Sequence, residues 1–125
     1  MVWGKNNLGQ LGIGNNGFQN TPIQLGNYAD ISEISAGVDY SLMRSDRNLV
    51  YAFGGNTYGQ LGSGDTLNTN LPQIISQHKF ISIHAGYYTS FGMKSDSSVW
   101  AWGNGTFGQT GLGQIANIHS PQFVK

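Results

Sequence analysis

The residues that could carry acid–base or metal chemistry in this sequence are few and widely spaced. The histidines are His78, His84 and His119, and none has a second His, Cys or carboxylate at the spacing of a metal-ligand motif. His84 falls on a stretch of alternating polar and apolar residues, which is typical of a partly buried structural position. We therefore predict that no histidine binds a metal or acts as a general base.

The six carboxylates offer no catalytic pair. Asp46 and Asp96 each follow a serine at a predicted turn, where an aspartate side chain bonds nearby backbone amides. Asp30 and Glu33 lie close in sequence, but nothing in the sequence pairs them across a cleft. The remaining carboxylates are Asp39 and Asp65. Because no Ser–His–Asp set can be assembled, we predict that the chain is not an enzyme and has no catalytic, cofactor-binding or metal-binding residues.

Two short motifs match known site patterns but lack the structural context of those sites. Residues 12–17 match the G-x-G-x-x-G of a dinucleotide site, which needs a helix directly after the glycines, and no helix is predicted there. Residues 104–106 form a glycosylation sequon inside a repeated motif, where we expect an unmodified loop. We expect no cofactor.

Composition excludes several further classes of protein. The 125-residue chain has 6 basic and 6 acidic residues, which argues against direct nucleic-acid binding through a basic surface. No apolar run approaches the roughly 20 residues of a membrane span. There is no cysteine, and the N-terminus lacks the pattern of a signal peptide. These features predict an intracellular protein, cytoplasmic or nuclear, without a membrane span.

The strongest feature of the sequence is an internal repeat. A glycine-rich motif covers residues 3–14, and closely similar motifs begin at Phe53 and Trp102, at offsets of 50 and then 49 residues. A period of this size indicates a supersecondary unit that packs on copies of itself. Residues that recur in each copy are predicted to be architectural, so only a residue that breaks the repeat is a candidate for function.

The recurring glycines and glutamines illustrate this architectural role. Glycine accepts positive φ without strain and lets a neighbouring backbone approach closely. We expect at least one of Gly9, Gly59 and Gly108 to use these properties. The glutamine after each of them is expected to bond backbone groups of its own loop, because buried amides need partners.

Each interval between glycine motifs contains four short stretches with strand character. They are residues 23–25, 31–35, 40–44 and 49–53 in the first interval, and 73–75, 80–84, 89–94 and 99–102 in the second. They are rich in β-branched and aromatic residues, and no window shows a helical period. Four-stranded antiparallel sheets repeated about an axis are propeller blades. We predict an all-β partial β-propeller of about two complete blades, with orphan strands at both ends, residues 2–3 and 122–124.

These motifs resemble the regulator of chromosome condensation repeat family over essentially the whole chain, residues 1–125. The resemblance rests on three Gly-Gln-x-Gly-x-Gly segments, on a proline after each, and on Ala-Gly at 36–37 and 85–86. The family usually has histidine shortly after Ala-Gly, where this chain has Tyr40 and Thr89. The family's Asp-Gly hairpin corresponds to residues 46–47 and 96–97. Because the family's propeller typically has seven blades, the resemblance implies a segment of a larger propeller.

Three tryptophans allow one further comparison within the family. The ultraviolet-B photoreceptor branch uses clustered tryptophans as its chromophore, and this chain has Trp3, Trp100 and Trp102. Because Trp3 and Trp102 occupy the repeated aromatic-Gly position, we expect them to pack in the core instead.

The resemblance implies a protein-interaction module, and one branch suggests a sharper version, guanine-nucleotide exchange on a Ran-like small GTPase. Such a factor needs no reacting side chain, because it binds the nucleotide-free GTPase better than the loaded form. A ligand-binding or enzymatic propeller fragment, and a structural scaffold without a GTPase partner, remain open alternatives. The open ends further predict self-association or packing against the remaining blades of a longer propeller.

Overall fold

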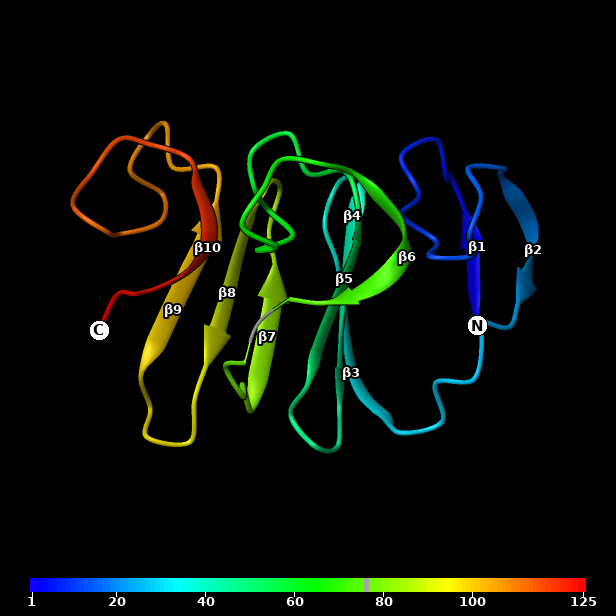
Figure 1. Cartoon of the computed structure of the whole chain (residues 1–125), viewed down its shortest axis with the longest axis horizontal. Coiled ribbons are helices and arrows are strands. Elements are labelled where there is room, and N and C mark those ends of the chain that lie inside the picture. The colour runs from blue at the N-terminus through cyan, green and yellow to red at the C-terminus, as the bar shows by residue number, and fades with distance from the viewer. Residues whose placement is uncertain (76) are drawn as a thin grey trace.

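The computed structural model describes residues 1–75 and 77–125. In these residues the chain forms ten strands and no helix (Figure 1), which confirms the all-β prediction. The strands are β1 (Val2–Gly4), β2 (Gln19–Ile23), β3 (Ile31–Ala36), β4 (Tyr40–Ser45), β5 (Val50–Gly54), β6 (Thr69–Ile74), β7 (Ser82–Ala85), β8 (Thr89–Met93), β9 (Val99–Gly103) and β10 (Ile118–Phe123). Nothing in these two ranges forms a helix long and apolar enough to cross a membrane.

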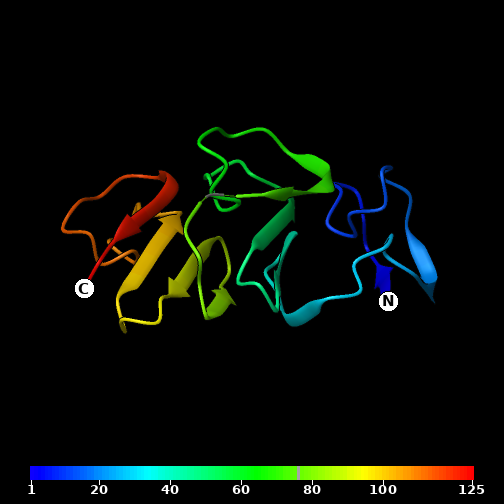
Figure 2. The same ribbon diagram turned by 60° about the horizontal axis from the view of Figure 1, so that its bottom comes forward.

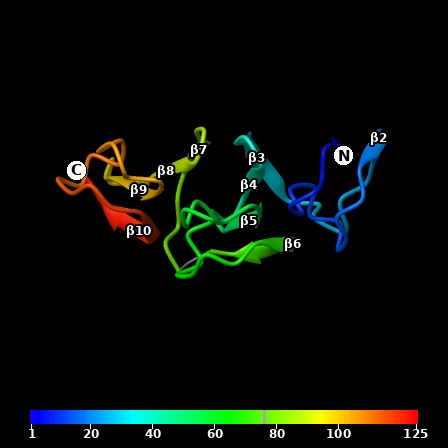
Figure 3. The same cartoon turned by 90° about the horizontal axis from the view of Figure 1, so that it is seen from above.

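The strands form two antiparallel four-stranded sheets and one two-stranded sheet. Strands β3 to β6 are neighbours in chain order in the middle sheet, strands β7 to β10 in the C-terminal sheet, and β1 pairs with β2. Seen from above, the sheets fan out, with β3 and β7 on one side and β6 and β10 on the other (Figure 3). Half a blade and two complete blades follow one another across the molecule (Figure 2), which confirms a partial propeller.

The prediction of an orphan strand at the C-terminus is wrong. Each glycine motif leads into the outermost strand of the same sheet, so β10 pairs with β9 just as β6 pairs with β5. The reason is that the glycine loop reverses the chain, which places Gly54 opposite Thr69 and Gly103 opposite Ile118. The N-terminal strand is not alone either, because β1 and β2 form a half-blade.

The outer strands begin earlier than their sequence predicts. Each includes the repeated proline, at Pro22, Pro72 or Pro121, although the pattern predicts a start after it. Proline lacks the N–H that a central strand needs and is confined to edges and bulges. Both conditions hold here, because each strand is outermost in its sheet and its register shifts around the proline.

The β4–β5 hairpin differs from the predicted Asp-Gly alignment. Equivalent residues of the two complete blades are 49 positions apart, since Tyr40 pairs with Gly54 and Thr89 with Gly103. Positive φ falls on Asn48 (62°) and on Ser97 (67°) at the equivalent place. The glycine-like position of the first hairpin is therefore Asn48, one residue later than predicted, and asparagine tolerates the left-handed conformation better than most residues.

The core lies between the two complete blades. Phe80, Leu61 and Trp102 are fully buried there, and Trp102 stacks on Phe80 with ring centroids 5.6 Å apart. Tyr40 reaches from β4 into the next sheet, where its hydroxyl donates to the carbonyl of Thr89 (3.1 Å). The two sheets are thus joined by apolar packing and by a buried polar contact.

A second polar contact joins β3 to β7. Glu33 Oε1 accepts from the backbone N–H of Ile83 (3.1 Å), while its Oε2 lies 2.7 Å from Arg44 Nε. Ser35 Oγ accepts from the backbone N–H of Ala85 (2.8 Å). The inner edge of the middle sheet is therefore held to the C-terminal sheet by side-chain acceptors on β3.

Candidate protein-interaction surface

Three glycine loops, residues 5–18, 55–68 and 104–117, lie at one end of the blades together with the β3–β4 and β7–β8 turns (Figure 1). The β4–β5 and β8–β9 hairpins lie at the opposite end (Figure 1). We call the first of these the loop end. The loop end carries the side chains that break the repeat, and it is therefore the candidate site.

A buried asparagine braces each of the first two loops. Asn6 Oδ1 accepts from the backbone N–H of Leu11, and Asn56 Oδ1 from that of Leu61, both at 2.9 Å. Their side-chain nitrogens donate to backbone carbonyls further along the same loop. These hydrogen bonds hold each of the two loops in one conformation and so support the side chains that the loop exposes.

The roles predicted for the repeated glutamines and glycines are confirmed. Gln10, Gln60 and Gln109 each accept, through Oε1, the backbone N–H two residues earlier, at 2.9, 2.9 and 2.8 Å. The glycine directly before each glutamine has positive φ, at 86°, 79° and 75°. These glycines and glutamines determine the conformation of the loops. Other residues of the loops are therefore the candidates for contact with a partner.

The third loop is built differently, because Gly105 takes the place of the bracing asparagine. Asn104 Oδ1 instead accepts from the backbone N–H of Thr106 (3.0 Å) and from its hydroxyl (2.8 Å). The sequon thus forms a compact turn of its own. That it carries no sugar stays a prediction.

Aromatic side chains gather where the second and third loops meet the β7–β8 turn. Tyr58 and Phe107 each stand directly before the repeated glycine of their loops, and Tyr87 and Tyr88 form the turn. Ring centroids lie 4.9 Å apart for Tyr58 and Tyr88 and 5.2 Å apart for Tyr87 and Tyr88. Tyr87 is 75% exposed and Phe107 is 89% exposed, and all four line one shallow cavity of about 540 Å³. We call these four residues the aromatic loop patch.

The patch has the chemistry of a protein-binding surface. Tyrosine supplies a large apolar ring and a hydroxyl at low cost in conformational entropy, and aromatic residues are enriched at interfaces. Partial desolvation, and then the carboxylate of Asp39, raise the pKa of Tyr88. A tyrosine hydroxyl is protonated at neutral pH in any case, and it can donate a hydrogen bond. The rings of the aromatic loop patch can therefore pack against an apolar group of a partner, and a tyrosine hydroxyl can donate a hydrogen bond to an acceptor on that partner.

Sequence reasoning missed this patch, although the repeat contained its signal. The positions equivalent to Tyr87 and Tyr88 in the preceding blade hold Val38 and Asp39. The repeat is therefore broken at the turn, where the sequence brings two tyrosines together. What the sequence could not show is that Tyr58, thirty residues earlier, packs against this turn.

The histidines lie on separate elements. His84 is exposed on β7, His119 is exposed on β10, and His78 lies in the segment between β6 and β7. Within the described residues no three His, Cys, Asp or Glu side chains are grouped as metal ligands would be. His78 Nδ1 lies 2.9 Å from Lys94 Nζ, and burial together with this cation lowers the pKa of His78.

The three tryptophans differ in burial. Core packing is confirmed for Trp102, which is fully buried. It is wrong for Trp3, which is 60% exposed because β1 has no inner strands beside it. Trp100 is half-buried, with Lys94 Nζ 3.8 Å from its ring centroid.

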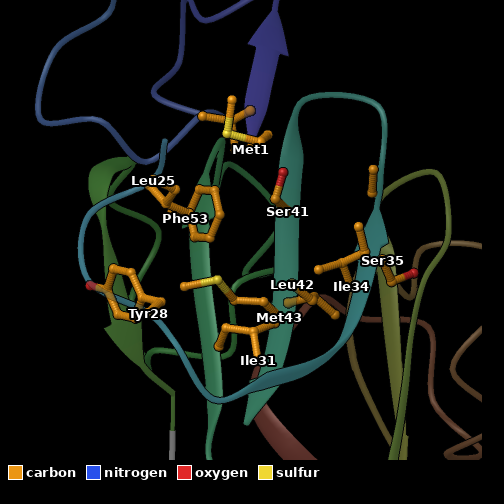
Figure 4. Close-up of a pocket in the computed structure, with 12 residues that line it drawn as sticks. Met1, Leu25, Tyr28, Ile31, Ile34, Ser35, Ser41, Leu42, Met43 and Phe53 are labelled. Carbon is orange, nitrogen blue, oxygen red and sulfur yellow. The ribbon is translucent and has the colours of Figure 1, made fainter. Parts of the chain in front are cut away.

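An apolar cavity of about 420 Å³ opens between the half-blade and the β3–β4 strands (Figure 4). Its wall includes Ile34, Met43 and Phe53. Ile34 is 79% exposed, whereas the equivalent Ile83 of the next blade is 4% exposed because the middle sheet covers it. The cavity is therefore the uncovered face of a blade rather than a shaped ligand site.

Comparison with known proteins agrees with this architecture. The chain is 41% identical over 75 residues to the ultraviolet-B receptor UVR8 of Arabidopsis thaliana, a match that covers 58% of this chain and 17% of the receptor. It is 34% identical over 101 residues to the X-linked retinitis pigmentosa GTPase regulator of Homo sapiens, covering 76% of this chain and 10% of that protein. The chain thus spans less than a fifth of either relative.

The fold is also similar to that of solved structures. Prp20p from Saccharomyces cerevisiae matches with a TM-score of 0.87 at 24% identity, over 98% of this chain and 33% of Prp20p. A family model described as "Regulator of chromosome condensation (RCC1) repeat" matches residues 2–43, 48–93 and 96–125, which include both complete blades and the half-blade. The chain belongs to the RCC1 repeat family.

Proposed function

We propose that residues 1–125 serve as one sector of a β-propeller that binds a protein partner through the aromatic loop patch. The observation that carries this proposal is the gathering of Tyr58, Tyr87, Tyr88 and Phe107 at one end of the blades. Two of the four rings are largely exposed, which is costly unless a partner covers them. Their amphipathic chemistry suits a protein surface.

For the partner we propose a small GTPase of the Ran type. Prp20p, whose fold this chain shares, binds Gsp1p and histones, and a human relative is a GTPase regulator. The four patch residues are tyrosine or phenylalanine, and the carboxylate of Asp39 lies near enough to raise the pKa of Tyr88. We accordingly propose that the protein acts in the cytoplasm or the nucleus.

The proposed mechanism is exchange by differential binding and needs no reacting side chain. A surface that holds the nucleotide-free GTPase more tightly than the loaded form lowers the affinity for the nucleotide by the same factor. The asparagine-braced loop that carries Tyr58 favours this role, because it loses little conformational entropy when the partner binds. The contribution of this chain is therefore a preformed aromatic surface.

A ligand-binding role is not favoured by the cavity beside β3 and β4. That cavity is lined mostly by apolar groups, and its counterpart on the next blade is filled by the neighbouring sheet. A ligand site usually combines apolar walls with a few convergent polar groups. We therefore assign the cavity to blade packing.

Binding of the purified chain to a Ran-type GTPase tests the proposal. We expect at least about tenfold tighter binding to the nucleotide-free form than to the GDP-loaded form, and faster release of a fluorescent GDP analogue. Tyr87→Ala and Phe107→Ala should each weaken binding by about tenfold or more, as aromatic hot-spot residues do. Phe123→Ala is the matched control, because Phe123 is 59% exposed on β10, outside the patch.

Three results separate the parts of the proposal. Absence of binding to every nucleotide state would overturn the GTPase as partner. Equal affinity for both states would replace exchange by a scaffold role. Binding that Tyr87→Ala and Phe107→Ala leave unchanged would overturn the assignment of the aromatic loop patch.

A further inference from the structure

The sequence contains two Asn-Gly pairs, Asn16-Gly17 in the first glycine loop and Asn104-Gly105 in the third. An asparagine that precedes glycine can lose its side-chain amide without an enzyme. The backbone nitrogen of the glycine attacks Cγ of the asparagine, and glycine has no Cβ to hinder the approach. In a folded chain, the rate of this reaction depends on how readily the pair opens locally.

The first pair is exposed and loosely held. Asn16 Nδ2 donates to the carbonyl of Asn7 at 3.3 Å, and Asn16 Oδ1 accepts from Asn70 Nδ2 at 3.2 Å. The N–H of Gly17 donates to Asn15 Oδ1 at 2.8 Å, also at the surface. Because water can replace each of these partners, releasing the Asn16 side chain and the Gly17 N–H costs little free energy.

The exposure of Asn16 belongs to this type of loop. The first loop lies in a formed contact with the middle sheet, where the N–H of Gly14 donates to the carbonyl of Asn70 (2.8 Å). In the second loop, which lies between two complete blades, the equivalent residue Thr66 is exposed as well. Contact with a neighbouring blade therefore leaves this position open to water.

The second pair is held more firmly and offers a comparison within the same chain. Asn104 Oδ1 accepts from the N–H (3.0 Å) and the hydroxyl (2.8 Å) of Thr106. The backbone of Asn104 donates to the carbonyl of Tyr88 and accepts from Thr89 Oγ1, both at 2.8 Å. Asn104 is half-buried and Gly105 is buried. Joining Asn104 Cγ to the Gly105 nitrogen would require several of these bonds to break together.

We propose that Asn16 is a site of spontaneous deamidation. The Gly17 nitrogen forms a bond to Asn16 Cγ and gives up its proton, while the Cγ–Nδ2 bond breaks and ammonia leaves. Water then opens the resulting cyclic imide at either of its two carbonyl carbons. Opening at one carbonyl gives aspartate with the ordinary backbone. Opening at the other gives isoaspartate, whose main chain runs through Cγ.

The two products have different consequences for the first loop. Asn6 Nδ2 donates to the carbonyls of Asn15 (2.8 Å) and Gly17 (3.0 Å), which flank Asn16. Isoaspartate inserts a methylene into the main chain between these carbonyls, so a single amide group no longer matches both. Aspartate keeps their spacing, and its carboxylate can still accept from Asn70 Nδ2. Isoaspartate therefore loosens the loop where it contacts β6, whereas aspartate adds only a charge.

Incubation of the folded chain at mildly alkaline pH, followed by peptide mapping with mass spectrometry, tests the proposal. Cleavage after lysine and arginine places Asn16 in peptide 6–44 and Asn104 in peptide 95–125. Fragmentation of each peptide locates the mass increase of an amide that has become a carboxylate. We expect Asn16 to convert at least about tenfold faster than Asn104 in the folded chain. In the urea-unfolded chain the two rates should be similar, because glycine follows both residues.

Two variants examine the reaction and its consequence separately. Gly17→Ala places a Cβ beside the attacking nitrogen, at a backbone outside the left-handed region, and should slow the conversion at least about tenfold. Asn16→Asp supplies the charge without the isoaspartate. Hydrogen–deuterium exchange at the Gly14 amide should accelerate in the aged chain that carries isoaspartate and stay near the parent rate in Asn16→Asp. Circular dichroism melting verifies that each variant is folded.

The contrary results are distinct from one another. Conversion of Asn104 as fast as that of Asn16 in the folded chain would overturn the proposal. So would an Asn16 that stays intact in the folded chain under conditions that convert it in the unfolded chain. Exchange at Gly14 that accelerates equally in Asn16→Asp would overturn the role given to isoaspartate.

Discussion

Gly59 and Gly108 have nearly the same backbone conformation but different surroundings. Their φ angles are 79° and 75°, and only Gly59 has backbone atoms within 3 Å of the position of its Cβ. An alanine at either position carries the strain of the left-handed region, about 1–2 kcal/mol. Gly59→Ala also forces two blades apart, and overpacking of this kind costs about 1–3 kcal/mol.

We therefore expect Gly59→Ala to lower the free energy of unfolding by about 1–3 kcal/mol more than Gly108→Ala does. Urea denaturation at a low protein concentration, where copies do not associate, measures the difference. Equal losses of unfolding free energy in the two variants would show that the contact between the second glycine loop and β10 accommodates a Cβ at Gly59 without loss of stability.

Tyr40 links stability to alkaline pH. Burial raises the pKa of Tyr40 from 10.0 to about 12, opposed by the hydrogen bond with Ser90. The folded-state pKa of Tyr40 lies above the unfolded-state value, so the folded protein holds the phenol proton more tightly. The contribution of Tyr40 to the free energy of unfolding is therefore fully present below pH 10 and is lost as the pH rises from 10 to 12. Two pKa units correspond to about 2–3 kcal/mol.

The variant Tyr40→Phe isolates this contribution. It keeps the ring and removes the hydroxyl that reaches Thr89, so it should cost about 0.5–1.5 kcal/mol at neutral pH. Between pH 10 and 12 its stability should fall less steeply than that of the parent chain. Parallel pH curves of the unfolding free energy for the two proteins would contradict the expectation.

The residues that the sequence could predict are those that act within their own repeat. The three glutamines bond the backbone two residues away, and recurrence alone indicates this role. Glu33 and Tyr40 were beyond such reasoning, because their partners Ile83 and Thr89 lie on the next sheet, about fifty residues along the chain. Tyr58 in the aromatic loop patch escaped prediction for the same reason.

At the scale of elements, β3 and β7 are held together through Glu33. The change Glu33→Ala leaves the Ile83 N–H without its acceptor and Arg44 without its ion-pair partner. A buried donor left unsatisfied costs about 1–3 kcal/mol, and the partly exposed ion pair adds little. We expect a loss of that size in urea denaturation.

Two matched variants sharpen this test. Glu33→Gln keeps an oxygen for the Ile83 N–H and removes only the charge, so it should lose less than Glu33→Ala. Asp46→Ala removes a carboxylate from the hairpin end, away from β7, and should change the stability by no more than about 0.5 kcal/mol. A larger loss in Asp46→Ala than in Glu33→Ala would contradict the role assigned to β3.

The strands themselves were largely predictable, and their grouping into sheets was not. Alternation and β-branched residues mark β3, β4, β5 and β9 closely in the sequence. The glycine loop, however, is long enough to look like a boundary between blades. Only the pairing of Gly54 with Thr69 shows that it is a turn within one blade.

At the scale of the whole molecule, contacts among the described strands join sheets that are neighbours in chain order. The middle sheet is covered by a complete blade on one side, and the half-blade has two strands and one neighbour. In such an array, stability is approximately a sum of units and of the contacts between them. The ends of the array should therefore open more often than its middle.

Because the half-blade has one neighbour, the exchange rates of its backbone amides should measure how often an end of the array opens locally. In hydrogen–deuterium exchange, the amides of β1 and β2 should exchange faster than those of β4 and β5, because local opening costs less free energy than global unfolding. Protection that is uniform along the chain would mean that half-blade and blades unfold as a single cooperative unit.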